Sequence, residues 1–283
     1  MIFNKIAILG AGLLGASFAL AAKRNALCAS ISVWSRSEST RNKCLARSDI
    51  FSEVAETPSD AVKDADFVLI CTPTETIPLI AKEISTSLKV GAIVSDVGSV
   101  KGKICTISSE VISASGAHFV GSHPMAGSEK VGIDFAEADL FEGCSCFITP
   151  ISENDKLYVE KLSSLWKALR MRVYVLSPEL HDAIVARVSH LPHIVASTIC
   201  DTASDFELNI LPYSGPGFRD TTRVSSGSPV IWESIVADNR AEILKALKDY
   251  SVRLNKIISA IETDDKDAIA KFFNKAKSFR DRL

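Results

Sequence analysis

Polar side chains of several kinds are clustered between residues 122 and 132, where the chain reads Ser-His-Pro-Met-Ala-Gly-Ser-Glu-Lys-Val-Gly. A neutral imidazole such as that of His123 can accept a proton from a substrate hydroxyl and so act as a general base. Pro124, the residue directly after His123, restricts the backbone there and holds the imidazole in place. We therefore predict that His123 is catalytic. The other polar side chains of the stretch are those of Ser128, Glu129 and Lys130.

A second candidate for chemistry is Ser99, in the stretch Asp-Val-Gly-Ser-Val-Lys from Asp96 to Lys101. We expect a strand to pass into a helix here, so Ser99 can cap that helix. Its hydroxyl can also be directed at a substrate or a nicotinamide, and the two roles are compatible. Both polar stretches follow expected strands, and open parallel sheets bind ligands at the carboxyl ends of their strands.

The element that would position a cofactor is a glycine-rich turn near the N-terminus. It has the spacing G-x-G-x-x-G and lies between an apolar run, Lys5 to Leu9, and an expected helix, Leu13 to Asn25. In this context Gly10 makes the tight turn, Gly12 admits a pyrophosphate, and Gly15 lets the helix pack on the strand. Free N–H groups at the start of the helix bind phosphate. The residues predicted to line the dinucleotide are Gly10, Gly12, Leu13, Leu14 and Gly15.

The loop after the next expected strand, Ser30 to Trp34, indicates which dinucleotide is preferred. A carboxylate for the ribose 2′-hydroxyl is usual there, but this chain has Ser-Arg-Ser. Arg36 with the serine hydroxyls, helped by Arg41, offers charge-assisted hydrogen bonds to a 2′-phosphate. We predict NADP in preference to NAD; the alternative is that Arg36 is a solvated loop cation. The loop residues expected beside the cofactor are Ser35, Arg36, Ser37, Thr72, Pro73 and Ser99.

Alternating strand and helix patterns continue to residue 177 and predict an α/β fold with a Rossmann-type dinucleotide-binding domain at residues 1–177. Two late strands, Cys146 to Thr149 and Arg172 to Leu176, are expected to extend the same sheet. The other expected strands are Phe67 to Cys71, Ala92 to Ser95 and His118 to Gly121. The expected helices are Thr76 to Leu88, Lys101 to Ser113 and Asn154 to Leu169.

From Pro178 the pattern becomes purely helical and predicts an all-α domain at residues 178–283. Its first helix contains His190 and His193 on one face, separated by Pro192, which should kink the helix and free backbone groups. The two imidazoles therefore contact a ligand or have a structural role. One apolar stripe of this helix is expected to be buried: Leu180, Ile184, Val188, Leu191, Val195 and Ile199.

A turn is expected in the stretch Ser214 to Arg223, because Gly215 and Gly217 flank a proline. Two arginines, Arg219 and Arg223, follow the turn within a few residues and suit recognition of a carboxylate. The alternative is a surface loop with solvated charges, and it applies more to Arg219 than to Arg223.

Two helices at the C-terminus indicate self-association. Apolar residues from Ile243 to Ile261 recur with the 3.5-residue spacing of helices that pack against partner helices, and a second amphipathic helix runs from Asp264 to Leu283. The domain can close on itself, but we predict a homodimer through it.

Composition excludes several classes of partner. With 283 residues, 47% hydrophobic and 23% charged, the chain is typical of a two-domain globular protein. Lys and Arg number 32 against 34 Asp and Glu, so we expect neither nucleic acid nor a membrane surface as a partner. The seven cysteines lack a C-x-x-C pair and predict reduced thiols, a cytoplasmic location and no metal.

One alternative remains at the N-terminus, where the uncharged run Ile6 to Ala22 has the composition of a signal peptide. The glycine spacing within it favours the nucleotide-binding interpretation instead. We expect no other run to be long and apolar enough to span a bilayer.

Taken together in order, five stretches closely resemble the prephenate and arogenate dehydrogenases of tyrosine biosynthesis over nearly the full chain. They are Gly10 to Gly15, Asp96 to Lys101, Gly121 to Gly127, Ser189 to His193 and Gly215 to Arg223. The resemblance implies NAD(P)-dependent oxidative decarboxylation in an interdomain cleft. It also implies a helical dimerisation domain, with no regulatory domain after Leu283.

The resemblance also implies roles for individual residues. His123 accepts a hydrogen bond from the 4-hydroxyl of the substrate, and Ser99 supports that hydroxyl and the nicotinamide. Arg223 pairs with a substrate carboxylate. The remaining residues expected near the substrate ring and side chain are His190, His193, Gly217 and Trp232.

Prephenate and arogenate are not distinguished, although the NADP-like loop favours arogenate. Two rival interpretations stay open: another NADP-linked reductase of the imine or β-hydroxyacid type, and a non-enzymatic NADP-binding redox sensor.

Overall fold

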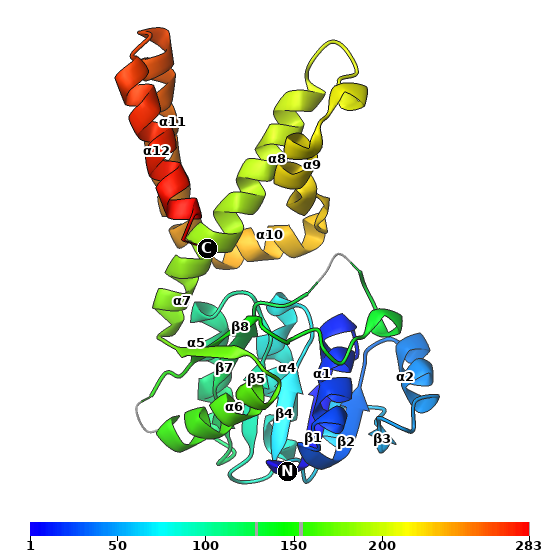
Figure 1. Cartoon of the computed structure of the whole chain (residues 1–283). Helices are drawn as coiled ribbons and strands as arrows, with labels where there is room; N and C mark the ends of the chain where they lie inside the picture. The colour runs from blue at the N-terminus through cyan, green and yellow to red at the C-terminus, as the bar shows by residue number, and fades with distance from the viewer. Residues whose placement is uncertain (128–129, 153–154, 283) are drawn as a thin grey trace.

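A six-stranded parallel sheet organises the first domain, with strand order β3-β2-β1-β4-β5-β6 (Figure 1). The chain reverses its direction of travel across the sheet between β1 and β4, so their carboxyl ends form the switch point at which such sheets bind ligands. The α/β fold class is thereby confirmed. The strands are β1 Phe3–Leu9, β2 Cys28–Trp34, β3 Glu53–Val54, β4 Phe67–Ile70, β5 Ile93–Asp96 and β6 His118–Phe119.

The computed structural model describes residues 1–127, 130–152 and 155–282. Ser128 and Glu129 of the polar stretch therefore lie outside the described residues. So do Asn154 and Leu283, at which we expected helices to begin and end.

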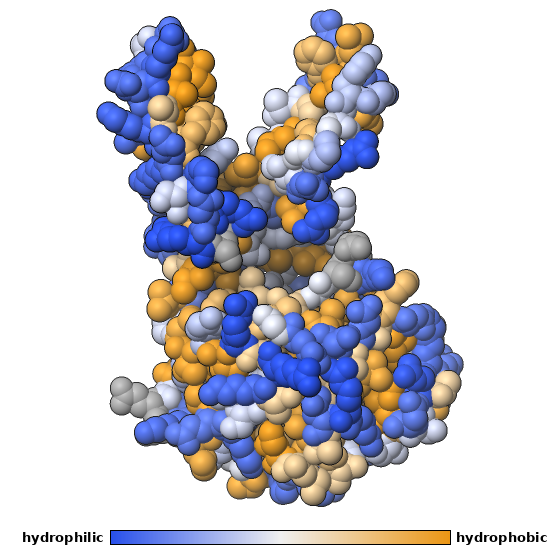
Figure 2. All heavy atoms as spheres, viewed as in Figure 1, coloured by the Kyte–Doolittle hydropathy of each residue, from blue (hydrophilic) through white to orange (hydrophobic). Residues whose placement is uncertain are grey.

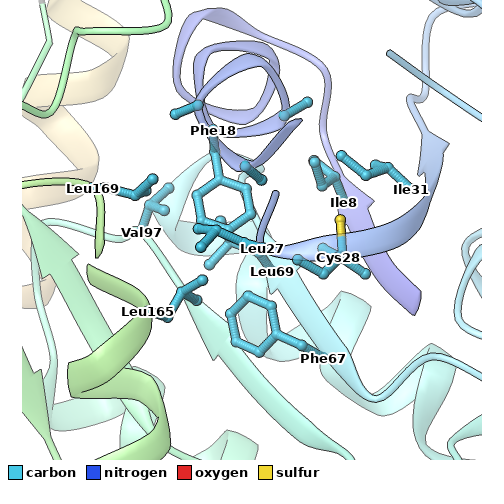
Figure 3. Close-up of a cluster of buried hydrophobic side chains, with 14 of the residues drawn as sticks. Ile8, Phe18, Leu27, Cys28, Ile31, Phe67, Leu69, Val97, Leu165 and Leu169 are labelled. Carbon is cyan, nitrogen blue, oxygen red and sulfur yellow. The ribbon is translucent and has the colours of Figure 1, made fainter. Parts of the chain in front are cut away.

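Helices pack on both faces of this sheet and enclose two apolar clusters. On one face Phe18 of α1 contacts Trp166 of α6 with ring centroids 5.5 Å apart, and it also contacts Phe67 of β4 (Figure 3). Because β1 and α1 are built into this core, the signal-peptide alternative is wrong. The helices are α1 Leu13–Arg24, α2 Glu38–Leu45, α3 Pro58–Ala61, α4 Ile77–Ile84, α5 Gly102–Ser113 and α6 Lys156–Ala168.

A second, three-stranded sheet contains β7 Gly121–Pro124, β8 Ser145–Thr149 and β9 Arg172–Val175. Our expectation that the last two strands extend the first sheet is wrong, because β8 pairs antiparallel with β7. The chain still follows the first sheet at Val120, whose N–H donates to Val94 at 2.9 Å. It changes partner at Gly121, where a Cβ would lie 2.5 Å from both Cys105 Sγ and Thr149 Oγ1.

The second domain is helical and has two arms that open as a V above the first domain (Figure 1). One arm contains α8 and α9, and the other contains α11 and α12. The domain consists of α7 Pro178–Val185, a π-helical turn Ala186–His190, α8 Leu191–Ser204, α9 Pro216–Thr222, α10 Pro229–Asp238, α11 Arg240–Glu262 and α12 Lys266–Arg280.

The expected kink at Pro192 is replaced by a wider turn. Residues 186–190 form a π-helical turn, after which α8 continues with Pro192 in its first turn. A proline has no N–H to donate and its ring displaces the carbonyl one turn earlier, so widening the preceding turn accommodates it without breaking the helix.

The expected turn after Gly215 also needs correction. The stretch after Gly215 is a helix and not a turn: Gly215 precedes α9, Pro216 begins it, and Gly217 lies inside its first turn. Proline is favoured at this first position because its missing N–H would have no partner there.

The apolar stripe of α7 and α8 is not buried within this chain. Leu180 is 52% exposed and Val188 61% exposed, and the other four side chains of the stripe are half-buried. Apolar side chains also gather on both arms (Figure 2). Contrary to our expectation, residues 178–204 are long and apolar enough to span a bilayer by length and composition, with 28% of the apolar window buried.

Candidate active site

The predicted base His123 lies on β7 and is linked to the helical domain by a chain of hydrogen bonds. Its Nδ1 is 2.8 Å from Nε2 of His181, and Nδ1 of His181 is 2.8 Å from Oδ1 of Asp182. His181 and Asp182 both belong to α7. All three side chains are buried, with His123 8% exposed. The structure thus joins a strand of one domain to a helix of the other at the predicted base.

Proton positions along this chain follow from Asp182, because a carboxylate only accepts hydrogen bonds. Nδ1 of His181 must donate to it, which leaves Nε2 of neutral His181 as an acceptor. Nδ1 of His123 must then donate to that nitrogen. The free lone pair of neutral His123 is therefore on Nε2, which hydrogen-bonds no described residue and remains available for a substrate hydroxyl.

The pKa shifts agree with this assignment. Burial, followed by the neighbouring charge of His181, holds the pKa of His123 well below 6.5. Burial also lowers the pKa of His181, although its hydrogen bond to Asp182 opposes the shift. Burial alone would raise the pKa of Asp182, but hydrogen bonds from His181 and two backbone N–H groups lower it. A charged carboxylate therefore stands next to two neutral imidazoles near neutral pH.

Asp182 also binds the start of α5. Its two carboxylate oxygens accept from the backbone N–H of Lys101 at 2.8 Å and of Gly102 at 2.9 Å. A negative charge is stabilised at a helix N-terminus by these free donors. Asp182 thus fills the capping role that we considered for Ser99. Ser99 itself is half-buried in the loop between β5 and α5 and forms no hydrogen bond with its side chain among the described residues.

A fully buried ion pair supports the strand that carries His123. The ammonium group of Lys101 contacts the carboxylate of Asp96 and donates to the carbonyl of Ser122 at 3.0 Å. Oδ1 of Asp96 accepts from the N–H of Ser122 at 3.2 Å. Because each charge is paired and hydrogen-bonded, the residue before His123 is held to β5 and α5.

The other two predicted histidines flank one indole. His193 stacks on Trp232 with ring centroids 3.5 Å apart, and His190 meets its edge at 5.9 Å. Gly227 makes room for this arrangement, since a Cβ there would lie 2.7 Å from Nε1 of Trp232. The structure therefore brings three of the five predicted substrate-binding residues together.

Arg223 and Gly217 are not brought into that cluster. Arg223 is exposed at the end of α9, and its guanidinium has no hydrogen bond or ion pair with the described residues. Gly217 is exposed on the same helix. A cavity of about 930 Å³ lies between α8, α10 and α11, and its lining includes His193 and Trp232 but not His123.

The glycine-rich turn has the shape that a dinucleotide requires. Gly10 has φ +110°, and a Cβ there would lie 2.7 Å from the carbonyl oxygen of Cys71, so only glycine fits. A Cβ on Gly12 would meet nothing within 4 Å, which leaves space for a pyrophosphate. Thr72 Oγ1 is buried without a hydrogen-bond partner among the described residues, so a bound cofactor can supply one. The residues present therefore fit NAD(P).

The loop predicted to select NADP is organised by Arg41. Its guanidinium donates to the carbonyls of Ser35 at 2.9 Å and Arg36 at 3.1 Å. Ser37 caps α2 by accepting from the N–H of Thr40. Arg36 is exposed and forms no ion pair within the described chain, which leaves its guanidinium available to a phosphate.

Our reading of the sequence missed His181 and Asp182. They follow Ser177, which caps α7 by accepting from the N–H of Leu180 at 3.2 Å. The adjacent His-Asp pair in the first turns of a helix was a visible signal, but only the packing of α7 against β7 connects it with His123. No group of three or more potential ligands is arranged to hold a metal ion in the described ranges.

Stability is expected to decrease as the pH falls below about 6.5, because buried histidines must take up protons on unfolding. Burial lowers the pKa of His190 from 6.5 to about 4 in the folded protein. Between these two pKa values the unfolded chain binds a proton and the folded chain does not. The free energy of unfolding therefore decreases as the pH is lowered through this range. Between about pH 7 and about pH 5 this one group contributes a loss of about 2 kcal/mol.

Chemical denaturation of the protein and of His190→Gln at the two pH values measures this contribution. The variant should lose about 2 kcal/mol less than the parent. Equal losses in the two proteins would show that His190 is not the group responsible.

Two family domains match the chain in succession. The domain described as "Prephenate dehydrogenase, nucleotide-binding domain" matches residues 18–175. The domain described as "Prephenate dehydrogenase, dimerization domain" matches residues 177–275.

Individual proteins show the same similarity. The prephenate dehydrogenase of Bacillus subtilis is 34% identical, over 99% of this chain and 76% of its own. The cyclohexadienyl dehydrogenase of Zymomonas mobilis is 31% identical, over 99% and 96%. The crystal structure of A. aeolicus prephenate dehydrogenase with hydroxyphenyl propionate and NAD⁺ is 30% identical, over 99% and 98%, with a TM-score of 0.91.

Proposed function

This chain belongs to the prephenate dehydrogenase family, and from this premise we propose NAD(P)-dependent oxidative decarboxylation of prephenate, arogenate or both, in tyrosine biosynthesis. The membership sets aside the imine or β-hydroxyacid reductase and the redox sensor considered above. One observation supports the reaction most directly. The His123–His181–Asp182 chain leaves the unprotonated Nε2 of a neutral His123 beside a nucleotide-binding sheet.

In the proposed mechanism, His123 binds the ring hydroxyl of the substrate through Nε2 and accepts its proton. When bound, NAD(P)⁺ would accept the hydride that leaves the ring carbon bearing this hydroxyl, while the ring carboxylate departs as carbon dioxide and the ring becomes aromatic. The positive charge that develops on His123 is stabilised through His181 by the carboxylate of Asp182. Ser99, in the loop after β5, is proposed to orient the hydroxyl. Burial of His123 excludes water, which strengthens these interactions.

The assay that tests this function measures NADH and NADPH formation with prephenate and with arogenate. Turnover with at least one of the four pairs is expected. Absence of turnover with all four, in a folded protein, would contradict the proposal.

For the substrate carboxylate we propose Arg223, which is exposed and without an ion-pair partner in the described chain. Replacing it with alanine should raise KM by about 10- to 100-fold, the equivalent of about 1.5–3 kcal/mol for a charged hydrogen bond. If the contact is equally strong in ground and transition states, kcat changes little. Arg172→Ala, an exposed arginine on β9, is the matched control. An unchanged KM in Arg223→Ala would exclude this contact.

We also propose that NADP is preferred and that Arg36 selects it. Arg36→Ala should raise KM for NADP by about 10-fold or more and leave KM for NAD within about threefold, because only NADP carries the 2′-phosphate. Arg47→Ala, just after α2, controls for lost positive charge. A parent enzyme that clearly prefers NAD would contradict the proposal.

The remaining parts of the proposal concern organisation. We propose that the chain divides at Ser177 and Pro178 and that the second domain forms a homodimer, since the exposed faces of α8 and α11 need a cover. A partner copy accounts for the exposed apolar helix at residues 178–204 better than a bilayer does, because that helix carries His181 and Asp182. We propose a cytoplasmic location, in agreement with seven free cysteines.

A further inference from the structure

Asn239 lies where α10 ends and α11 begins, and it is 4% exposed. Both backbone polar groups of Asn239 have hydrogen-bond partners in the backbone, so the side chain is not needed to cap either helix. The N–H donates to Ile235 at 2.9 Å, and the carbonyl accepts from Ile243 at 3.0 Å. The side-chain nitrogen Nδ2 is 2.9 Å from the carbonyl oxygen of Asp182 and 3.2 Å from Nδ1 of His190. One amide thus contacts both a member of the hydrogen-bond chain and a predicted substrate-binding histidine.

The orientation of this amide is determined by the carbonyl of Asp182. A backbone carbonyl only accepts, so the NH₂ group of Asn239 must face it. The opposite orientation would place two oxygens against each other in a buried site. Because the NH₂ group has two hydrogens, the second can be donated to Nδ1 of His190.

The amide in turn determines the tautomer of His190. An NH₂ group cannot accept, so Nδ1 of His190 must be the unprotonated nitrogen. The single proton of the neutral ring is therefore on Nε2. No described residue accepts a hydrogen bond from this nitrogen, so its N–H remains for a ligand. The same ring meets the edge of Trp232, which stacks on His193.

We propose that Asn239 is a positioning residue that fixes His190 as the Nε2–H tautomer, so that His190 offers a hydrogen-bond donor to the substrate. This inference rests on the proposed function. It adds a requirement that was not visible in the sequence: the corner between α10 and α11 must contact α7 for the substrate cluster to be complete.

Substitution separates this role from simple packing. Asn239→Asp replaces the donor with an acceptor, which favours a proton on Nδ1 of His190 and removes the donor on Nε2. Asn239→Leu removes the contact with a side chain of similar size. Both variants should raise KM for the substrate by about 5- to 10-fold and leave kcat within about threefold, as expected for loss of one neutral hydrogen bond that is equally strong in both states.

Ala246→Gly is the control, because it weakens α11 at a buried position without touching the amide. Its KM should stay within about twofold of the parent when its thermal midpoint is lowered as much as in Asn239→Leu. A KM in Asn239→Asp no higher than in this control would overturn the proposal.

A second measurement does not depend on turnover. In the ¹⁵N-histidine-labelled protein, long-range nitrogen–proton correlation spectra distinguish the two tautomers, and His190→Gln assigns the signal among the five histidines. We expect Nδ1 of His190 to be unprotonated in the parent and protonated in Asn239→Asp. A protonated Nδ1 in the parent would overturn the inference. Absence of turnover in the parent would contradict only the proposed function.

Discussion

His123→Asn is expected to lose roughly 10²- to 10⁴-fold in kcat, the range typical for loss of a positioned general base. The substituted amide can still donate a hydrogen bond to Nε2 of His181, but it offers no basic lone pair to the substrate hydroxyl. The hydroxyl contact of His123 is only one part of the proposed substrate binding, and Arg223 is proposed to bind the carboxylate, so KM should change much less. Initial rates with the preferred substrate and cofactor measure both constants.

The matched control is His118→Asn. His118 stacks on Tyr158 at 3.7 Å on β6 and lies outside the hydrogen-bond chain, so its replacement should leave kcat within about twofold. Thermal unfolding of both variants shows whether the fold is retained. A folded His123→Asn enzyme with kcat close to that of the parent would rule out the proposed base.

Asp182→Asn is expected to reduce kcat by roughly 10²-fold or more, although the residue does not touch the substrate. Oδ1 of Asp182 accepts from Lys101 and His181, and Oδ2 accepts from Gly102, so asparagine has one oxygen for these three donors. If the oxygen takes the place of Oδ1, the tautomers stay as they are and the negative charge that stabilises protonated His123 is lost. If the oxygen takes the place of Oδ2, the NH₂ group faces His181. Nδ1 of His181 then becomes an acceptor and its proton moves to Nε2. That proton is donated to Nδ1 of His123, whose own proton moves to Nε2 and removes the lone pair. In Ser-His-Asp triads, replacing the aspartate with asparagine gives the wrong histidine tautomer and lowers kcat by at least this much.

Asp265→Asn provides the control for lost helix capping. Asp265 caps α12 by accepting from the N–H of Ala268 at 2.9 Å. It is far in sequence from His123, His181 and Asp182. The control should lower the thermal midpoint slightly and leave kcat unchanged. If both Asp-to-Asn variants retain full kcat, Asp182 has only a structural role.

Local patterns in the sequence determined the parts of the protein that depend on short-range geometry. The turn from Gly10 to Gly15 requires residues without a Cβ, because one added at Gly15 would lie 2.0 Å from the carbonyl of Gly10. The helices α11 and α12 follow from apolar spacing, and α7 from Pro178 with its serine cap. His123 could be selected because it follows an expected strand, and open parallel sheets bind ligands at the carboxyl ends of their strands.

The tertiary structure alone decided which distant groups meet. His181 and Asp182 are 58 and 59 positions after His123, and no pattern within α7 shows that it packs on β7. The change of sheet at Gly121 depends on contacts with Cys105 and Thr149, which are likewise far apart in the chain. Periodicity showed that one face of α8 is apolar, but whether that face is covered depends on which elements lie against it. Spacing determines faces and turns through local sterics, whereas long-range packing determines the tautomer of the base and the partners of each face.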